Sequence, residues 1–173
     1  MSSPDAPSTI DDSRSSTAGF ADWVRPHWDC MVRFAQRLVG DDDAEDVVQD
    51  ALAAAWRSRS RFDQSKGQAR TWLLTIVGNQ ARNHLRRHRI TRAVQHSVEE
   101  GAGAAGEGLV VSIDMARALA RLTDRQRMAI ALHYYCGLSI SECAEVLVCS
   151  AGTVKSTLSD ARGHLRSILG DDY

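Results

Sequence analysis

The chain has 173 residues, of which 43% are hydrophobic and 25% are charged, and its formal net charge at pH 7 is −1. These values are ordinary for a soluble protein of one medium or two small domains, and they neither favour nor exclude a nucleic-acid partner. No apolar run approaches the roughly 20 residues of a membrane span. The N-terminus lacks the basic and apolar start of a secretory signal. The four Cys residues form no paired framework, so we expect a cytoplasmic protein with reduced thiols.

The beginning of the chain predicts a disordered tail followed by a helix. Residues 1–19 are rich in Ser and poor in large apolar side chains, which is typical of disorder. Residues 20–39 predict a helix in which Pro26 lies near the start, where proline is tolerated, and which Gly40 ends. Large side chains recur there every three or four residues and predict one buried face: Trp23, His27, Met31, Phe34 and Leu38.

A second helix, over residues 41–59, is predicted to be acidic on its exposed face. It opens with three Asp residues, which suit the positive end of a helix dipole. Between Asp41 and Asp50 there are six acidic residues and no basic one. The residues alone leave two interpretations open: a solvated face, or a docking surface for a basic partner.

The charge inverts over residues 57–92, where ten Lys or Arg residues accompany a single acid, Asp63. We expect a polar loop over 61–70 and a helix over 71–89. One face of that helix carries amide and cationic side chains that suit base edges and phosphates, and the adjacent loop suits unpaired strands. An Arg-rich helix end that matches the helix dipole explains only part of this charge excess. The pattern therefore favours a nucleic-acid surface.

Residues 93–111 are rich in Gly and Ala and show no periodicity, which predicts a flexible linker between a first domain over 20–92 and a second over 112–169. The second domain is predicted to hold four helices. Two capping boxes mark helix starts: Thr123 with Gln126, and Ser139 with Glu142. The predicted fold is all-α, with two helical domains joined by a flexible linker, the second containing a helix-turn-helix.

The last two predicted helices form the helix-turn-helix. Gly137 can end the helix before them, and Ser150 is a candidate N-cap of the second. That second helix has a buried face of Val154, Leu158, Ala161 and Leu165 at helical spacing. Its opposite face carries short hydroxyls and cations that suit a DNA major groove: Thr153, Lys155, Ser156, Ser159 and Arg162. An ordinary helical hairpin is the alternative.

Motifs for catalysis or cofactor binding are absent from the sequence. There is no Gly-rich phosphate loop and no nucleophile, His and acid series, so we expect no catalytic residue, no cofactor and no small-molecule substrate. His27 and Cys30 lack a second pair at zinc-type spacing, so the sequence predicts no metal site. Cys136, Cys143 and Cys149 are expected to be small core residues, with a thiol switch as the alternative.

Four segments carry a more specific pattern: Asp43-Ala-Glu-Asp-Val-Val-Gln-Asp-Ala-Leu, Arg70-Thr-Trp-Leu-Leu-Thr-Ile-Val-Gly-Asn-Gln-Ala-Arg-Asn-His-Leu-Arg-Arg, Leu122-Thr-Asp-Arg-Gln-Arg and Gly152-Thr-Val-Lys-Ser. In this order, with a linker between the second and the third, they resemble the extracytoplasmic function (ECF) sigma factors of bacterial RNA polymerase. The resemblance covers residues 20–92 and 112–169.

The resemblance implies a role for each predicted surface. The acidic helix would dock on the clamp coiled coil of the polymerase β′ subunit through Asp43, Glu45, Asp46, Gln49 and Asp50. The basic loop and helix would open the −10 promoter element and hold a flipped base through Arg61, Lys66, Arg70, Trp72, Asn79, Arg82, Asn83, Arg86 and Arg87. The second domain would contact the β flap and read the −35 element through Ser150, Thr153, Lys155, Ser156, Ser159 and Arg162.

Two positions depart from the family pattern: Asp160 stands where Arg is usual, and Thr123 where Pro is common. An acid at 160 would repel phosphate, so one backbone contact and the −35 sequence are expected to differ. We expect a non-enzymatic promoter-specificity subunit that binds core RNA polymerase and promoter DNA, is cytoplasmic and nucleoid-associated in holoenzyme, and is held by an anti-sigma factor. The alternative is a stand-alone LuxR-like regulator, which leaves the basic block unexplained.

Overall fold

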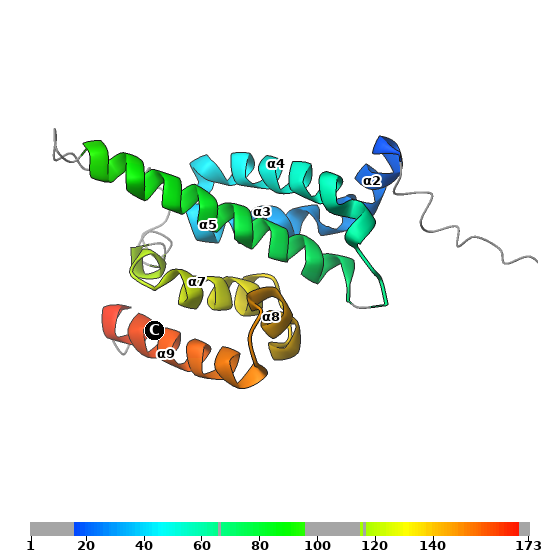
Figure 1. Ribbon diagram of the computed structural model, residues 1–173. Coiled ribbons are helices and arrows are strands. Elements are labelled where there is room, and N and C mark those ends of the chain that lie inside the picture. The colour runs from blue at the N-terminus through cyan, green and yellow to red at the C-terminus, as the bar shows by residue number, and fades with distance from the viewer. Residues whose placement is uncertain (1–15, 66, 96–114, 116, 170–173) are drawn as a thin grey trace, which may run out of the picture.

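The computed structural model describes residues 16–65, 67–95, 115 and 117–169, and every regular element among them is helical (Figure 1). The N-terminal half, defined as residues 16–95, contains α2 (Thr17–Val24), η1 (Arg25–His27), α3 (Trp28–Val39), α4 (Asp41–Ser58), η2 (Arg59–Arg61) and α5 (Ala69–Gln95). The C-terminal half, defined as residues 117–169, begins with helical residues 117–120. It continues with α7 (Asp124–Ile130), a π-helical turn η3 (Ala131–Tyr135), α8 (Ile140–Leu147) and α9 (Ala151–Leu169).

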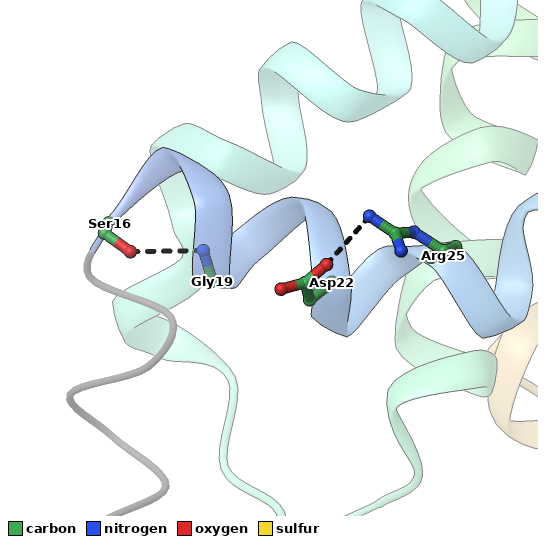
Figure 2. A network of polar contacts seen from close by, with 4 residues as sticks. All are labelled: Ser16, Gly19, Asp22 and Arg25. Carbon is green, nitrogen blue, oxygen red and sulfur yellow. Dashed lines mark hydrogen bonds and ion pairs between the residues drawn. The ribbon is translucent and has the colours of Figure 1, made fainter.

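The single helix predicted over residues 20–39 is divided in two. A 3-10 turn that contains Pro26 separates α2 from α3, because proline has no N–H to donate to the preceding turn. The first helix also starts earlier than predicted, since the Ser16 side chain accepts a hydrogen bond from the Gly19 N–H at 3.1 Å (Figure 2). An ion pair of 2.8 Å between Asp22 and Arg25 spans its last turn (Figure 2). Part of the stretch assigned to the tail is therefore helical.

Local helix signals in the sequence are found where they were predicted. Gly40 ends α3 with φ 93°, and Gly137 has φ 66° in the turn before α8. Both capping boxes are formed, Thr123 with Gln126 and Ser139 with Glu142. The N-terminal tail over residues 1–15 and most of the predicted linker lie outside the described residues. Residues 93–95 of that linker continue α5.

Each half has a helical core, and the two cores are continuous. In the N-terminal half α3, α4 and α5 pack on one another, and in the C-terminal half α7 and α8 pack on α9 (Figure 1). The halves meet where α3 contacts α7 and η3, and where α5 contacts α8. Buried side chains from both halves, such as Phe34, Leu74, Met128 and Leu132, belong to one hydrophobic cluster. In this structure the two predicted domains are thus packed against each other.

Within the residues that the structure describes, no helix combines the length and apolarity needed to cross a bilayer.

Candidate protein and nucleic-acid interfaces

The acidic face of α4 projects from the N-terminal half. Its apolar stripe of Ala44, Val47, Val48, Ala51 and Ala55 is buried against α3 and α5. This orientation leaves Glu45, Asp46, Gln49 and Asp50 exposed. Gln49 Nε2 donates to Glu45 Oε1 at 3.2 Å, one helical turn apart. Four of the five residues predicted to bind polymerase therefore share an accessible, negatively charged face.

Asp43, the fifth residue of that predicted set, is placed differently. It is half-buried, and its Oδ2 lies 3.1 Å from Nε2 of His84 on α5. The carboxylate therefore faces the neighbouring helix.

An aromatic cluster supports the loop that joins η2 to α5. Trp23, Phe62 and Trp72 lie with ring centroids 5.2–5.8 Å apart. Such tilted ring contacts contribute roughly 0.5–1.5 kcal/mol each beyond their buried area. Phe62 is buried and Trp72 is half-buried. Trp72, which was predicted to contact DNA, is thus part of this structural cluster, and only part of its ring is exposed to solvent.

Two clefts open beside this cluster. One, of about 410 Å³, is lined by Arg61, Phe62, Thr71 and Trp72 among others. The other, of about 510 Å³, is lined by the loop residues Gln64, Ser65, Gly67 and Gln68 together with Trp23. Aromatic walls with nearby polar groups suit an unstacked base. Lys66, which was predicted to bind DNA here, lies outside the described residues.

Acidic side chains of α8 wall these clefts from the other half. Glu145 borders both clefts and Glu142 borders the larger one. The pKa of Glu142 is held below its ordinary value, mainly because the side chain and the N–H of Ser139 hydrogen-bond to it, with a smaller effect of the Arg70 charge. Glu142 is therefore ionised at neutral pH, and a phosphate entering the larger cleft would meet a negative charge.

The remaining polar residues of the basic helix lie along α5. Asn79, Arg82, Arg86 and Arg87 are exposed, and Asn83 is half-buried. The Asn79 side-chain oxygen accepts a hydrogen bond from Arg82 Nη2, so these two predicted contacts act as a pair. The face remains strongly basic, which suits a phosphate backbone.

Arg70 binds the C-terminal half in this structure. It is half-buried, donates through Nη2 to the Cys136 carbonyl, and lies 3.5 Å from the Cys30 thiol. In this structure Arg70 Nη2 is therefore directed to the C-terminal half.

A pair of thiols also spans the two halves. Cys136 Sγ lies 3.7 Å from the Cys30 carbonyl oxygen, and both side chains are buried. The pKa of the Cys30 thiol is lowered to about 6, first by the neighbouring Cys136 thiol and then by the cations Arg70 and Arg33, against the opposing effect of burial. The pKa of Cys136 is raised, because it donates to Cys30 and is buried. Sequence analysis did not pair these residues, since 106 positions separate them.

The helix-turn-helix forms where it was predicted, although Leu165 of its predicted buried face is only half-buried. Ser150 caps α9, because its hydroxyl accepts a hydrogen bond from the Thr153 N–H at 3.1 Å. The turn is closed by Val148, which has φ 49° and is 82% exposed. Val154, Leu158 and Ala161 are buried against α7 and α8. The opposite face is exposed and polar: Ser150, Lys155, Ser156, Ser159, Asp160 and Arg162. Thr153 is half-buried.

The contact between the halves depends on two residues that sequence analysis missed. Arg127 donates to Leu38 O at 3.2 Å in the N-terminal half, and to Leu119 O, Ala120 O and Leu122 O at 2.9–3.2 Å in its own half. Gly78 is buried in α5 where a Cβ would lie 2.7 Å from Met128 Cε. Neither role has a local sequence signal, because each depends on a partner about 50 or more residues away.

Comparison with known proteins assigns both halves to one family. Residues 23–91 match the Sigma-70 region 2 family, and residues 112–165 match Sigma-70 region 4. The ECF RNA polymerase sigma factor SigK of Mycobacterium bovis is 34% identical over 136 residues, which are 73% of this chain and 72% of SigK. The ECF RNA polymerase sigma factor SigL of Mycobacterium tuberculosis is 34% identical over 153 residues, 83% of this chain and 84% of SigL.

Two solved structures share the fold. The sigma factor RpoE of Bartonella quintana, in complex with the anti-sigma factor NepR, superposes with a TM-score of 0.74 at 30% identity and covers 89% of this chain and 98% of RpoE. CnrH, in complex with the cytosolic domain of CnrY, superposes with a TM-score of 0.70 at 27% identity and covers 95% of this chain and 96% of CnrH.

Proposed function

The chain belongs to the ECF sigma factors of RNA polymerase, which direct transcription initiation at particular promoters, and we propose how its surfaces divide that work. The observation that carries the proposal is the presence of region 2 and region 4 in one chain and in that order. A stand-alone LuxR-like regulator is not favoured, because a helix-turn-helix regulator has no need of region 2.

The acidic face of α4 binds core polymerase. Glu45, Asp46, Gln49 and Asp50 offer an exposed negative surface to a basic partner, which we take to be the clamp coiled coil of the β′ subunit. Asp43 contributes from a half-buried position at the first turn. The chain performs no catalysis itself, and polymerase supplies the chemistry.

The two halves then bind two promoter elements. The polar face of α9 enters the major groove at the −35 element. There Lys155, Arg162 and the Ser hydroxyls hydrogen-bond to phosphates or to base edges. The basic face of α5 and the clefts beside Trp72 hold the opened −10 element. Two weak sites held at a fixed spacing bind far better than either alone.

Opening of the −10 element requires the halves to separate. In the packed arrangement Glu142 and Glu145 border the clefts that would receive bases, and Arg70 is engaged by the Cys136 carbonyl. Separation removes the acidic wall and releases this guanidinium. Arg70 therefore contacts DNA only in the separated form.

We infer an anti-sigma partner and a cytoplasmic location. RpoE and CnrH were both solved with a bound partner protein, named an anti-sigma factor in the case of NepR. A protein that binds either half could hold the packed arrangement or prevent it. The free chain is then stored in the cytoplasm, and holoenzyme carries it to the nucleoid.

Transcription in vitro tests this function. Core polymerase with the purified chain should initiate at specific sites of a genomic promoter library, and core polymerase alone should not. The free chain should bind the selected duplexes weakly, and the holoenzyme should bind them tightly. Equal, sequence-specific binding by the free chain, or failure to retain core polymerase in a pull-down, would contradict the proposal.

A further inference from the structure

Three side chains with metal-binding chemistry meet between α4 and α5, outside the surfaces assigned above to DNA, and one of them, Asp43, also lies beside the proposed polymerase surface. Asp43 lies in the first turn of α4, and His84 and His88 lie on α5. One carboxylate oxygen and one nitrogen from each ring all lie within 4.8 Å of one another.

The helix geometry fixes this arrangement. His84 and His88 are four residues apart, so one turn of α5 places their rings on the same side, with centroids 4.3 Å apart. The packing of α4 on α5 then brings Asp43 Oδ2 to 3.1 Å from His84 Nε2.

The nitrogen of His84 has an unused bonding position. It is buried and makes no hydrogen bond within the described residues, although Asp43 Oδ2 lies 3.1 Å away. A buried polar atom without a partner is costly, and coordination to a cation would satisfy both it and the carboxylate.

We propose that Asp43, His84 and His88 bind a divalent transition-metal ion of the zinc class. Two imidazole nitrogens and one carboxylate oxygen suit Zn²⁺, Co²⁺ or Ni²⁺, whereas Mg²⁺ and Ca²⁺ prefer oxygen ligands alone. Three protein ligands leave at least one position for water or for a ligand from a partner. The site joins the first turn of α4 to α5, so a bound ion stabilises the packing of these helices.

A plain ion pair between a protonated His84 and Asp43 is the competing explanation. It gives His88, which is exposed, no role. If Asp43 and His84 form only an ion pair, removal of the His88 ring should not change metal affinity. If the three residues form a metal site, the same change should weaken metal binding.

Co²⁺ titration of the full, untagged chain under reducing conditions separates them. We expect visible absorption bands of Co²⁺ bound by nitrogen and oxygen, without the thiolate charge-transfer band that binding to the four Cys residues would produce. The same site should bind Zn²⁺, which should displace Co²⁺. Zn²⁺ at 100 times its dissociation constant should raise Tm by roughly 5–10 °C, and the same concentration of Mg²⁺ should not.

Matched variants locate the site. His88→Ala and Asp43→Asn should each weaken Zn²⁺ binding at least about tenfold. His164→Ala removes another exposed helical His and should leave binding unchanged. Circular dichroism in the absence of metal checks that each variant is folded. Failure of the wild type to bind, a cobalt–thiolate spectrum, or unchanged affinity in His88→Ala would each overturn the proposal. None of these measurements uses polymerase or DNA, so their outcome does not depend on whether the proposed function is correct.

Discussion

The polar face of α9 is open to solvent, whereas the clefts beside Trp72 are partly walled by the other half of the molecule. Lys155, Ser159 and Arg162 are exposed on a helix whose cap and buried stripe are complete within the C-terminal half. The clefts of the N-terminal half border on Glu142 and Glu145 of α8. Under the proposed function, one nucleic-acid surface is thus ready before the halves part, and the other becomes ready only afterwards.

This difference shows that the contact between the halves decides which surface is available. Besides the shared hydrophobic cluster, the contact includes a few identifiable groups: Arg127, Gly78 against Met128, Arg70 with Cys136, and the Arg37 guanidinium 4.4 Å from the centre of the Tyr135 ring. Changes at these groups should alter the N-terminal clefts and leave the face of α9 as it is.

The largest effect is expected from Arg127→Met. The change removes four hydrogen bonds from a guanidinium to backbone carbonyls, of which Leu119 O still accepts from the Leu122 N–H. The loss should lower the free energy of unfolding by roughly 3–4 kcal/mol. Urea denaturation measures this loss. Arg125→Met changes an exposed Arg of the same helix and should cost less than about 0.5 kcal/mol. Equal losses of unfolding free energy in the two variants would show that Arg127 does not stabilise the contact between the halves.

Gly78→Leu should separate the halves while each stays folded. A Cβ at this position would lie 2.7 Å from Met128 Cε, the end of a flexible side chain, and 3.6 Å from Phe34 Cε1 of its own half. A Leu side chain reaches further than a Cβ, so we expect it to push Met128 and α7 away from α5 at a cost of about 1–3 kcal/mol. Small-angle X-ray scattering should show a larger radius of gyration, and single-stranded DNA should bind more tightly. Gly163→Leu, on the exposed side of α9 with no atom within 4 Å of a built Cβ, is the control. An unchanged scattering profile for Gly78→Leu would contradict this reasoning.

The thiol pair should make folding stability depend on pH. Because the pKa of Cys30 is about 6 in the folded chain against an ordinary value of 9.0, the folded state favours the thiolate. Its contribution is complete above pH 9 and is lost as the pH falls towards 6. Unfolding free energies measured between pH 6 and pH 9 should therefore rise with pH, and Cys30→Ser should reduce the rise. A slope that is identical in the variant would show that the thiolate does not form.

Val148→Gly should stabilise the chain by about 1 kcal/mol. Val148 has φ 49°, a conformation that a β-branched residue adopts at a cost and glycine adopts readily. Because its side chain is 82% exposed, little packing is lost. Thermal unfolding measures the gain. This change concerns the turn before α9 alone and should leave the scattering profile unaltered, and a drop in Tm would show that the Val side chain stabilises the turn.

The smallest effect is expected from Glu145→Gln. The exposed carboxylate borders both clefts, and its removal should strengthen binding of single-stranded DNA a few-fold at low salt, with a smaller effect at high salt. Fluorescence anisotropy with a short oligonucleotide measures this. Asp29→Asn, an exposed acid on α3 that borders neither cleft, should change nothing. If both variants bind the oligonucleotide more tightly, and to the same extent, then net charge controls binding and the cleft wall does not.

The sequence predicted what short-range patterns determine. The capping boxes at Thr123 and Ser139 and the cap at Ser150 join residues three apart, so the chain order alone reveals them. It did not predict where helices touch. Arg70 and Trp72 were read as DNA contacts, but their partial burial depends on packing that no local pattern reports. The meeting of Asp43 with His84 likewise depends on how α4 lies on α5.

Glu142 and Glu145 also matter while the chain is not bound to polymerase. A bacterial cell holds a vast excess of transcripts and non-promoter DNA, and an uncovered cleft that accepts unstacked bases would be occupied by these competitors. Under the proposed function, the carboxylates that border the clefts would repel these competitors until the halves part. The acidic wall would in this way keep free subunits available to polymerase.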